Sequence, residues 1–289
     1  MKEKRTLRKK ISIGFPIIIM ATVLAFSLFY LKFYKNKYVE NPIVVIIPSY
    51  NNIKWFDKNL SLLKAQNKRY NTWRAIYIDD CSKDGTPNAV EKYIRDNNLE
   101  NQITLIKNKE RKGSLENVYN AAHSCKNNEI IVICDGDDFL HNENVLNYIN
   151  YVYQDKQVWM TYGQYEIFPS GQLGQCQQIP EIVIDQNGFR DYKWVSSHLR
   201  TFRASLFKRI KKEDLLFQGK FFPVTTDMAA MFPMLEMAGK HAKFIPKTLY
   251  VYNQDNPINN YKTRLNLQLY LDRFIRSKER YETLETLET

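Results

Sequence analysis

Three carboxylates lie within four positions at the end of an apolar run in the middle of the chain. Residues 130–134 have the length and composition of a strand buried in a sheet, and Asp135, Asp137 and Asp138 follow directly. Carboxylates near a core are costly to keep unless a cation compensates their charge. Oxygen ligands of this kind suit Mg²⁺ or Mn²⁺ bridging phosphates, so the stretch predicts a divalent metal that holds a phosphorylated ligand. A solvated turn is the alternative interpretation.

Strand and helix patterns alternate before these carboxylates. Strands are expected at 43–47, 73–78, 103–106 and 130–134, with helices at about 53–63, from Thr86 and from Ser114. This order predicts right-handed βαβ units on a mostly parallel sheet with helices on both faces. Such sheets bind ligands beyond the carboxyl ends of their strands. Polar residues gather there at Pro48, Ser49, Tyr50, Asn51, Asp79, Asp80, Asp135, Asp137 and Asp138.

The pattern changes beyond Asp138. We expect a helix at 144–153, a strand at 158–162, a hairpin or loop at 164–178 and an amphipathic helix from Asn260 to about Tyr281, followed by a frayed tail. Glu236 is expected to be an ordinary surface residue. The four cysteines have no CxxC spacing, which predicts free thiols and argues against zinc.

Four blocks of sequence resemble family-two glycosyltransferases of the GT-A fold, an inverting group that uses nucleotide-sugar donors. The blocks are residues 46–52, 78–86, 108–113 with Asn117, and 134–138. In order and spacing they cover about residues 42–140, and the resemblance continues more loosely to Asn256. It implies an α/β fold with a Rossmann-like central sheet. Residues 42–140 would form the nucleotide-sugar-binding half, residues 141–256 the acceptor half, and residues 257–289 a C-terminal helix and tail.

The resemblance also implies roles for residues of the donor half. Asp137 would coordinate the metal on the diphosphate, Asp135 would lie near the ribose, and Asp138 would support the site from behind or cap a helix. The residues implied to bind the nucleotide sugar are Pro48, Tyr50, Asn51, Asp79, Arg111, Gly113, Asn117 and Asp135. A solvated loop charge remains open for Arg111, and a packing role for Tyr50.

The acceptor half resembles the family less closely. The stretch 225–228 is similar to its acidic catalytic block, with Thr226 where a Glu often stands, so Asp227 would be the general base. A helix N-cap is the alternative for Asp227. His198 and Arg200 are candidates for the acceptor side, although a lone His is often structural. Tyr250, Tyr252 and Asn253 could form a lid or pack in the core.

The N-terminal end carries most of the excess charge. Six basic residues and one acidic residue lie in positions 1–10, and residues 11–31 contain no charge. A charge-free stretch of this length predicts a transmembrane anchor, with 32–41 as a stem. The basic residues favour a cytoplasmic N-terminus and a lumenal, Golgi-like catalytic domain in a eukaryotic or viral protein. A bacterial protein would need the opposite orientation.

The sequence therefore predicts a membrane-anchored, metal-dependent, inverting glycosyltransferase of the hexosyltransferase type. Its partners would be a nucleoside-diphosphate sugar, a hydroxyl acceptor on a glycan, lipid or protein, and the membrane, but not nucleic acid. Mn²⁺ or Mg²⁺ would be the cofactor. A nucleotidyltransferase-like enzyme and a catalytically inactive, membrane-tethered module that binds a nucleotide or sugar are the alternatives.

Overall fold

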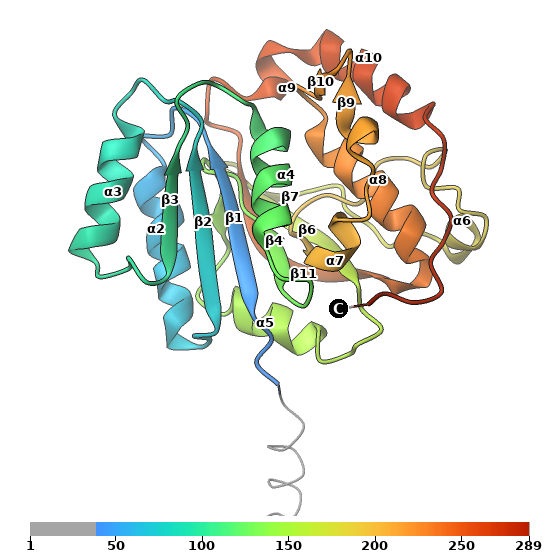
Figure 1. The fold of residues 1–289 in the computed structure, drawn as a ribbon, viewed down its shortest axis with the longest axis horizontal. Coiled ribbons are helices and arrows are strands. Elements are labelled where there is room, and N and C mark those ends of the chain that lie inside the picture. Colours follow the sequence, from blue (N-terminus) through green and yellow to red (C-terminus); the bar gives the residue numbers. More distant parts are fainter. Residues whose placement is uncertain (1–38, 289) are drawn as a thin grey trace, which may run out of the picture. The chain divides into compact units, whose positions relative to one another are not determined.

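The computed structural model describes residues 39–288, and residues 41–288 form one compact unit. Within the described residues, a central sheet has nine strands in the order β3-β2-β1-β4-β8-β6-β11-β5, with β7 paired to β6 (Figure 1). Its strands are β1 (Ile43–Ser49), β2 (Trp73–Asp79), β3 (Ile103–Lys107), β4 (Ile130–Ile133), β5 (Phe139–Leu140), β6 (Met160–Phe168), β7 (Gln172–Leu173), β8 (Arg200–Arg203) and β11 (Ala242–Asn253). A separate hairpin pairs β9 (Leu216–Phe217) with β10 (Lys220–Phe221).

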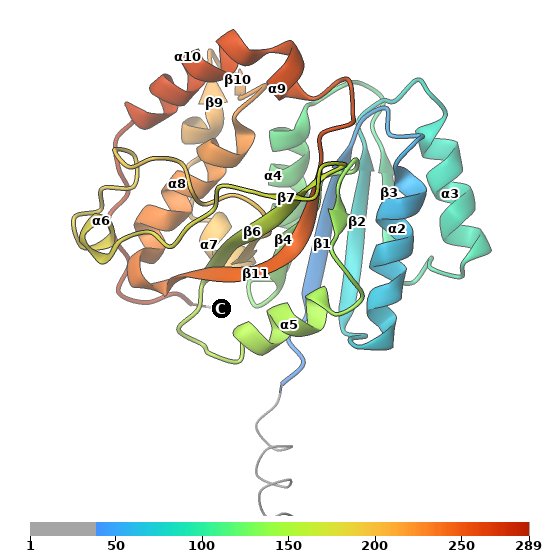
Figure 2. The same ribbon diagram turned by 180° about the vertical axis from the view of Figure 1, so that it is seen from behind.

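The described residues contain nine α-helices, and most of them lie in two layers, one on each face of the sheet. They are α2 (Phe56–Ala65), α3 (Thr86–Asp96), α4 (Ser114–Ser124), α5 (Val145–Val152), α6 (Glu181–Asp185), α7 (Ala204–Phe207), α8 (Thr226–Ala238), α9 (Asn260–Thr263) and α10 (Leu265–Arg276). Apolar residues of α4, α7, α8 and α10 pack on one face, and those of α2, α3 and α5 on the other. Figure 2 shows α2 and α5 on the face opposite α4.

Alternation along β1 explains why the sheet is buried on both faces. Val44 and Ile46 belong to the core under α4, whereas Ile43, Val45 and Ile47 belong to the core under α2. Successive side chains of a strand point to opposite faces, so a continuous apolar run fits a strand covered on both sides.

The first four strands are parallel and end at one edge of the sheet. β1 pairs with β2 and with β4, and the pairing of Ser49 with Asp79 places the ends of β1 and β2 side by side. The βαβ half of the predicted fold is therefore confirmed. Beyond β4 the sheet becomes mixed, because β8 runs antiparallel to both β4 and β6.

β11 brings the end of the domain back to its centre. It lies parallel to β6 and antiparallel to β5, which begins directly after Asp138. Residues 253–259 therefore emerge beside the carboxylates of the 135–138 stretch.

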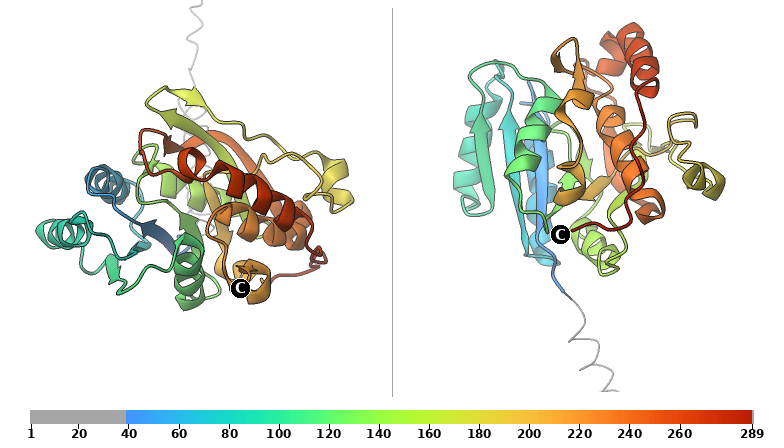
Figure 3. Two further views of the ribbon diagram at one scale, coloured as in Figure 1. Left: turned by 90° about the horizontal axis from the view of Figure 1, so that it is seen from above. Right: turned by 45° about the vertical axis from the view of Figure 1, so that its right-hand side comes forward.

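The C-terminal region differs from the prediction. The expected helix is divided into α9 and α10, and α10 packs across α8 (Figure 3). Instead of fraying, the tail packs Tyr281, Leu284 and Leu287 against the core, and the Leu284 N–H donates to the Met237 carbonyl.

Glu236 is buried rather than on the surface. Its Oε2 accepts a hydrogen bond from Arg190 Nη2 at 2.9 Å, and both side chains are at most 2% exposed. The same oxygen accepts the N–H of Tyr281. This ion pair connects α8 with the segment before β8 and with the tail.

The predicted localisation needs correction. None of the helices in residues 39–288 combines the length and the apolar character that a bilayer crossing requires. This finding contradicts the prediction of a single-pass membrane protein. The basic tail, the anchor at 11–31 and nearly all of the stem, on which it rested, lie outside the described residues.

Candidate active site

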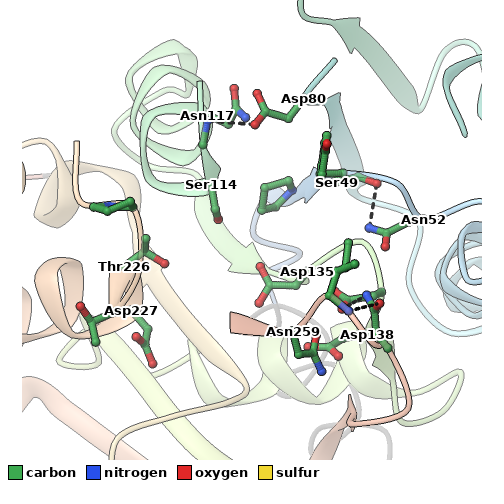
Figure 4. Close-up of a pocket in the computed structure, with 18 of the residues that line it drawn as sticks. Ser49, Asn52, Asp80, Ser114, Asn117, Asp135, Asp138, Thr226, Asp227 and Asn259 are labelled. Atoms are coloured by element: carbon green, nitrogen blue, oxygen red, sulfur yellow. Dashed lines mark hydrogen bonds between the residues drawn. The ribbon is translucent and has the colours of Figure 1, made fainter. Parts of the chain in front are cut away.

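A cavity of about 290 Å³ opens at the carboxyl edge of the parallel strands. It is bordered by the turns after β1, β2 and β4, the N-terminal ends of α4 and α8, and the segment after β11. Of the residues predicted from sequence, it is lined by Pro48, Tyr50, Arg111, Gly113, Asn117, Asp135, Asp137, His198, Arg200 and Asp227. Figure 4 shows Asp135 near its centre, with Thr226 and Asp227 reaching in from α8.

Asn51 and Asp79 were predicted to bind the donor but do not line this cavity. Asn51 connects two turns, since its N–H donates to Ser82 Oγ at 2.8 Å and its Oδ1 accepts the N–H of Lys83 at 3.0 Å. Asp79 is buried, and its Oδ2 accepts the N–H of Ser82 at 3.0 Å. Both residues fix the shape of the turns, and it is the next residue, Asp80, that reaches the cavity.

Asp80 holds the loop that follows β3. Its carboxylate accepts the backbone N–H groups of Lys112 and Gly113 and the side-chain amide of Asn108, each at 2.9 Å. Burial alone would raise the pKa of Asp80, but these hydrogen bonds lower the pKa below its ordinary value. Gly113 has φ +90°, a backbone conformation that residues other than glycine rarely adopt.

Arg111 lies on the ring of Tyr50, although its side chain remains 55% exposed to solvent. The guanidinium carbon is 3.6 Å from the ring centroid, a cation–π contact, and Nε is 3.8 Å from Asp80 Oδ2. Tyr50 and Arg111 therefore form a stacked pair that borders the cavity.

Gly136 lets the end of β4 approach the turn after β1. A Cβ atom at this position would lie 2.6 Å from Ser49 Cβ and 2.8 Å from Asn52 Nδ2. The residue between Asp135 and Asp137 must therefore be glycine for these two segments to pack as they do.

The three carboxylates of this stretch have different surroundings. Asp135 and Asp137 are half-buried and line the cavity. Asp138 is buried, its Oδ2 accepting from the Tyr250 hydroxyl at 2.7 Å and its Oδ1 from the Asn253 N–H at 2.8 Å. Tyr250 thus has a structural role, and Asp138 joins the end of β4 to the end of β11.

The proximity of these acids disfavours their charged forms. Burial and the neighbouring Asp135 charge raise the pKa of Asp137 to about 6. Burial and the charge of Asp137 hold the pKa of Asp138 well above its usual range. The pKa of Asp135 is also raised by burial, although the charge of Arg200 opposes this shift.

Arg200 links the two halves of the site. Its Nη2 lies 3.2 Å from Asp135 Oδ2, and its Nη1 lies 4.0 Å from Asp227 Oδ2. The side chain is 9% exposed, so the two carboxylates share a buried positive charge.

His198 lies beside Arg200 and stacks on Tyr250, with ring centroids 4.4 Å apart. Burial, followed by the nearby Arg200 charge, lowers the pKa of His198 well below its ordinary value, so the ring is neutral at physiological pH.

Asp227 lies in the first turn of α8, which begins at Thr226. The N-cap is Thr225, so Asp227 does not occupy the capping position. Thr225 has φ +54°, a strained conformation for a β-branched residue. This turn directs Asp227 into the cavity.

A cluster of possible metal ligands lies at the same place. Ligand atoms of Asp135, Asp138 and His198 all lie within 4.8 Å of one another. Asp137, the metal ligand predicted from sequence, lines the cavity next to this cluster.

The prediction missed the contribution of the chain after β11. Asn256, Ile258, Asn259, Arg264 and Gln268 also line the cavity. Asn256 Nδ2 donates to Asp137 Oδ2 at 2.7 Å, which fixes this segment on the carboxylate. The asparagine-rich run at 253–260 was the available signal, but its position depends on the pairing of β11 with β6 and β5.

Comparison with known proteins identifies the family. Residues 44–236, more than half of the chain, match the model of glycosyl transferase family 2, and the chain belongs to this family. Over 101 residues it is 29% identical to the poly(ribitol-phosphate) beta-N-acetylglucosaminyltransferase TarS of Staphylococcus aureus. That match covers 35% of this chain and only 17% of TarS.

Solved structures show the same fold. S. aureus TarS 1–349 in complex with UDP-GlcNAc is 18% identical with a TM-score of 0.55, covering 77% of this chain and 60% of that one. The mannosyltransferase PcManGT from Pyrobaculum calidifontis, in complex with GDP-Man and Mn²⁺, is 19% identical with a TM-score of 0.56, covering 92% and 76%. The predictions of a glycosyltransferase family and of a GT-A type α/β core are confirmed.

Proposed function

We propose that this protein transfers a sugar from a nucleoside-diphosphate sugar to a hydroxyl acceptor, with inversion and with the help of a divalent metal. One observation carries the proposal: a single cavity joins the carboxylates after β4 to Asp227 at the start of α8 through Arg200. Solved structures with this fold hold UDP-GlcNAc or GDP-Man, which supports a donor of the same class.

The nucleotide would bind at the turns after β1 and β2. Tyr50 with Arg111 offers a flat, positively charged surface, and the loop fixed by Asp80 presents the N-terminus of α4 to the cavity. A helix N-terminus favours anionic groups such as phosphates. Arg264 would add a further positive charge from the other side of the cavity.

The carboxylates after β4 fit a divalent cation. They offer oxygen ligands, which suit Mn²⁺ or Mg²⁺. Burial and the neighbouring Asp135 charge raise the pKa of Asp137, and a bound cation would favour its charged form. We assign Asp137 as a ligand, with Asp135 next to it. Asp138 is less suitable because both of its oxygens already accept hydrogen bonds. A bound cation would stabilise the negative charge of the departing diphosphate.

Asp227 is the proposed general base. An inverting transfer needs one carboxylate to take the proton of the acceptor hydroxyl as that hydroxyl attacks the anomeric carbon. Arg200 lies between Asp227 and Asp135, so it would orient the base and keep the two carboxylates together. His198 is neutral and would form part of the floor of the site.

The test is the release of nucleoside diphosphate from a panel of nucleotide sugars, with and without Mn²⁺. We expect metal-dependent release by the wild type. Asp137→Ala should remove it, and Asp227→Asn should lower kcat by about 10²- to 10⁴-fold while retaining donor binding.

Asp96→Ala is the matched control, because Asp96 is an exposed acid at the end of α3. This variant should behave as the wild type does. Metal-dependent release that survives in both active-site variants would refute the assignments, and the absence of release with any donor would refute the function.

A further inference from the structure

A second, smaller cavity of about 30 Å³ adjoins the proposed active site. Its boundary shares five residues with the main cavity, which are Ser114, Asp135, Arg200, Thr226 and Asp227. The recess, as we call it, therefore lies where the base and the carboxylate after β4 come together.

The remaining walls of the recess are apolar. They come from α4, β4, β8, α7 and α8 and include Leu115, Phe202, Ala230 and Met234. A cavity needs about 10–15 Å³ to hold one water molecule, and cavities with apolar walls stay dry. The recess has space for a group of two or three heavy atoms. Its inner, apolar walls favour a methyl group, whereas the five shared residues make the side toward the main cavity polar.

One residue that lines both the recess and the main cavity has a polar atom without a partner. Arg200 Nε is buried and forms no hydrogen bond with any of the described residues, although the Nη2 atom of the same side chain contacts Asp135. A buried donor without an acceptor is costly, so a ligand oxygen at this position would be favoured. Arg200 therefore brings one unpaired N–H donor to the border of the recess, beside its apolar walls.

We propose that the recess binds the N-acetyl group of the transferred sugar, and that the donors are nucleoside-diphosphate N-acetylhexosamines. This inference rests on the proposed function, which places the sugar between Asp137 and Asp227. The methyl group packs against Leu115, Ala230 and Met234, and the carbonyl oxygen accepts from Arg200 Nε–H. A hexose with a hydroxyl at the same carbon leaves the apolar walls without a partner and offers no carbonyl oxygen to the N–H donor.

The first experiment compares matched donors on the wild-type protein with Mn²⁺. Calorimetric binding and product release are measured with UDP-GlcNAc and UDP-GalNAc, and with UDP-glucose and UDP-galactose. We expect the N-acetylated donors to be favoured by about 10- to 200-fold, because filling a pocket matched to one small group gives discrimination of this size.

Variants of the recess provide the second experiment. Ala230→Leu fills the space, so the preference for N-acetylated donors should disappear, with a ratio of about 1 between the two kinds of donor. Met234→Ala enlarges the space, so a donor with an N-propionyl group should be used as well as the N-acetyl donor. Met237→Ala is the matched control: it makes the same truncation on the same buried helix but away from the recess. It should keep the wild-type ratio.

The outcomes separate this inference from the proposed function. Binding that favours N-acetylated donors without any release would refute the transferase and support the recess. Release that is equal for N-acetylated and unsubstituted donors would support the transferase but refute the proposal that the recess binds the N-acetyl group. Binding of none of the four sugars, or an unchanged preference in Ala230→Leu, would also overturn it.

Discussion

Gly136, the smallest residue of the site, leaves no space for a larger side chain. Because an added Cβ at Gly136 would meet Ser49 at 2.6 Å, we expect Gly136→Ala to push the turn after β1 away from the carboxylates. Crowding of this kind costs about 1–3 kcal/mol of stability. Denaturant unfolding should show this loss, and donor KM should rise because Tyr50 moves with the turn.

Gly188→Ala is the control for that substitution. A Cβ at Gly188 would make only ordinary contacts, 3.6 Å or more from Val183, and the backbone there has no positive φ. Its stability and KM should match the wild type. If Gly136→Ala matched the wild type too, the packing described for the two turns would be incorrect.

Sequence reasoning at the residue scale could place side chains near the site but could not orient them. Asp79 and Asp80 are adjacent, and a strand sends adjacent side chains to opposite sides. Which of the two faces the cavity depends on the turn after β2, because Asp80 follows the last residue of that strand and is bound by the loop before α4. Asp138 posed the same problem, since its partners Tyr250 and Asn253 lie more than a hundred residues away.

At the scale of elements, α8 is fixed at the end that lies away from the site. Its first turn carries Asp227, and its last turns are fixed by the buried pair of Arg190 and Glu236 and by the C-terminal tail. Glu236 follows a hydrophobic run near the end of the helix, and nothing in the local pattern indicates a partner before β8. Such a contact cannot be derived from periodicity alone.

The pair allows a direct comparison of single and double substitutions. Glu236→Met or Arg190→Met should lower stability by about 3–5 kcal/mol, because each leaves one buried charge without its partner. The double variant should be less destabilised than either single variant, because no uncompensated charge remains. Denaturant unfolding measures all three, and a double variant as unstable as the sum of the singles would show that the pair is not the source of the effect.

At the scale of the whole molecule, ligand binding should stabilise the fold. A ligand at about 100 times its Kd stabilises the folded state by about 2.7 kcal/mol. For a domain of this size, that corresponds to about 5–10 °C in Tm. We therefore expect UDP or GDP together with Mn²⁺ to raise the Tm further than the nucleotide alone.

Scanning calorimetry on the wild type and on Asp137→Ala tests this linkage. The part of the increase that depends on Mn²⁺ should disappear in the variant. An increase that persists without Asp137 would place the metal elsewhere, for instance on the cluster of Asp135, Asp138 and His198.

The two parts of the sheet differed in how well they could be predicted. The βαβ part follows from local signals, namely apolar runs of strand length separated by helices with clear starts such as Thr86 and Ser114. The other part depends on pairings between segments far apart, such as β4 with β8 and β6 with β11. No local sequence pattern indicates either pairing. The mixed sheet and the contribution of α10 to the cavity were therefore seen only in the structure.

The contacts of Asp138 have a consequence for synthesis on the ribosome. Its carboxylate needs Tyr250 and Asn253, which leave the ribosome long after β4 and at only about 5–20 residues per second. Until β11 has entered the sheet beside β5, the carboxylates after β4 lack their supporting partners. A nascent chain therefore gains its donor site at the end of translation rather than when the first half of the fold is complete.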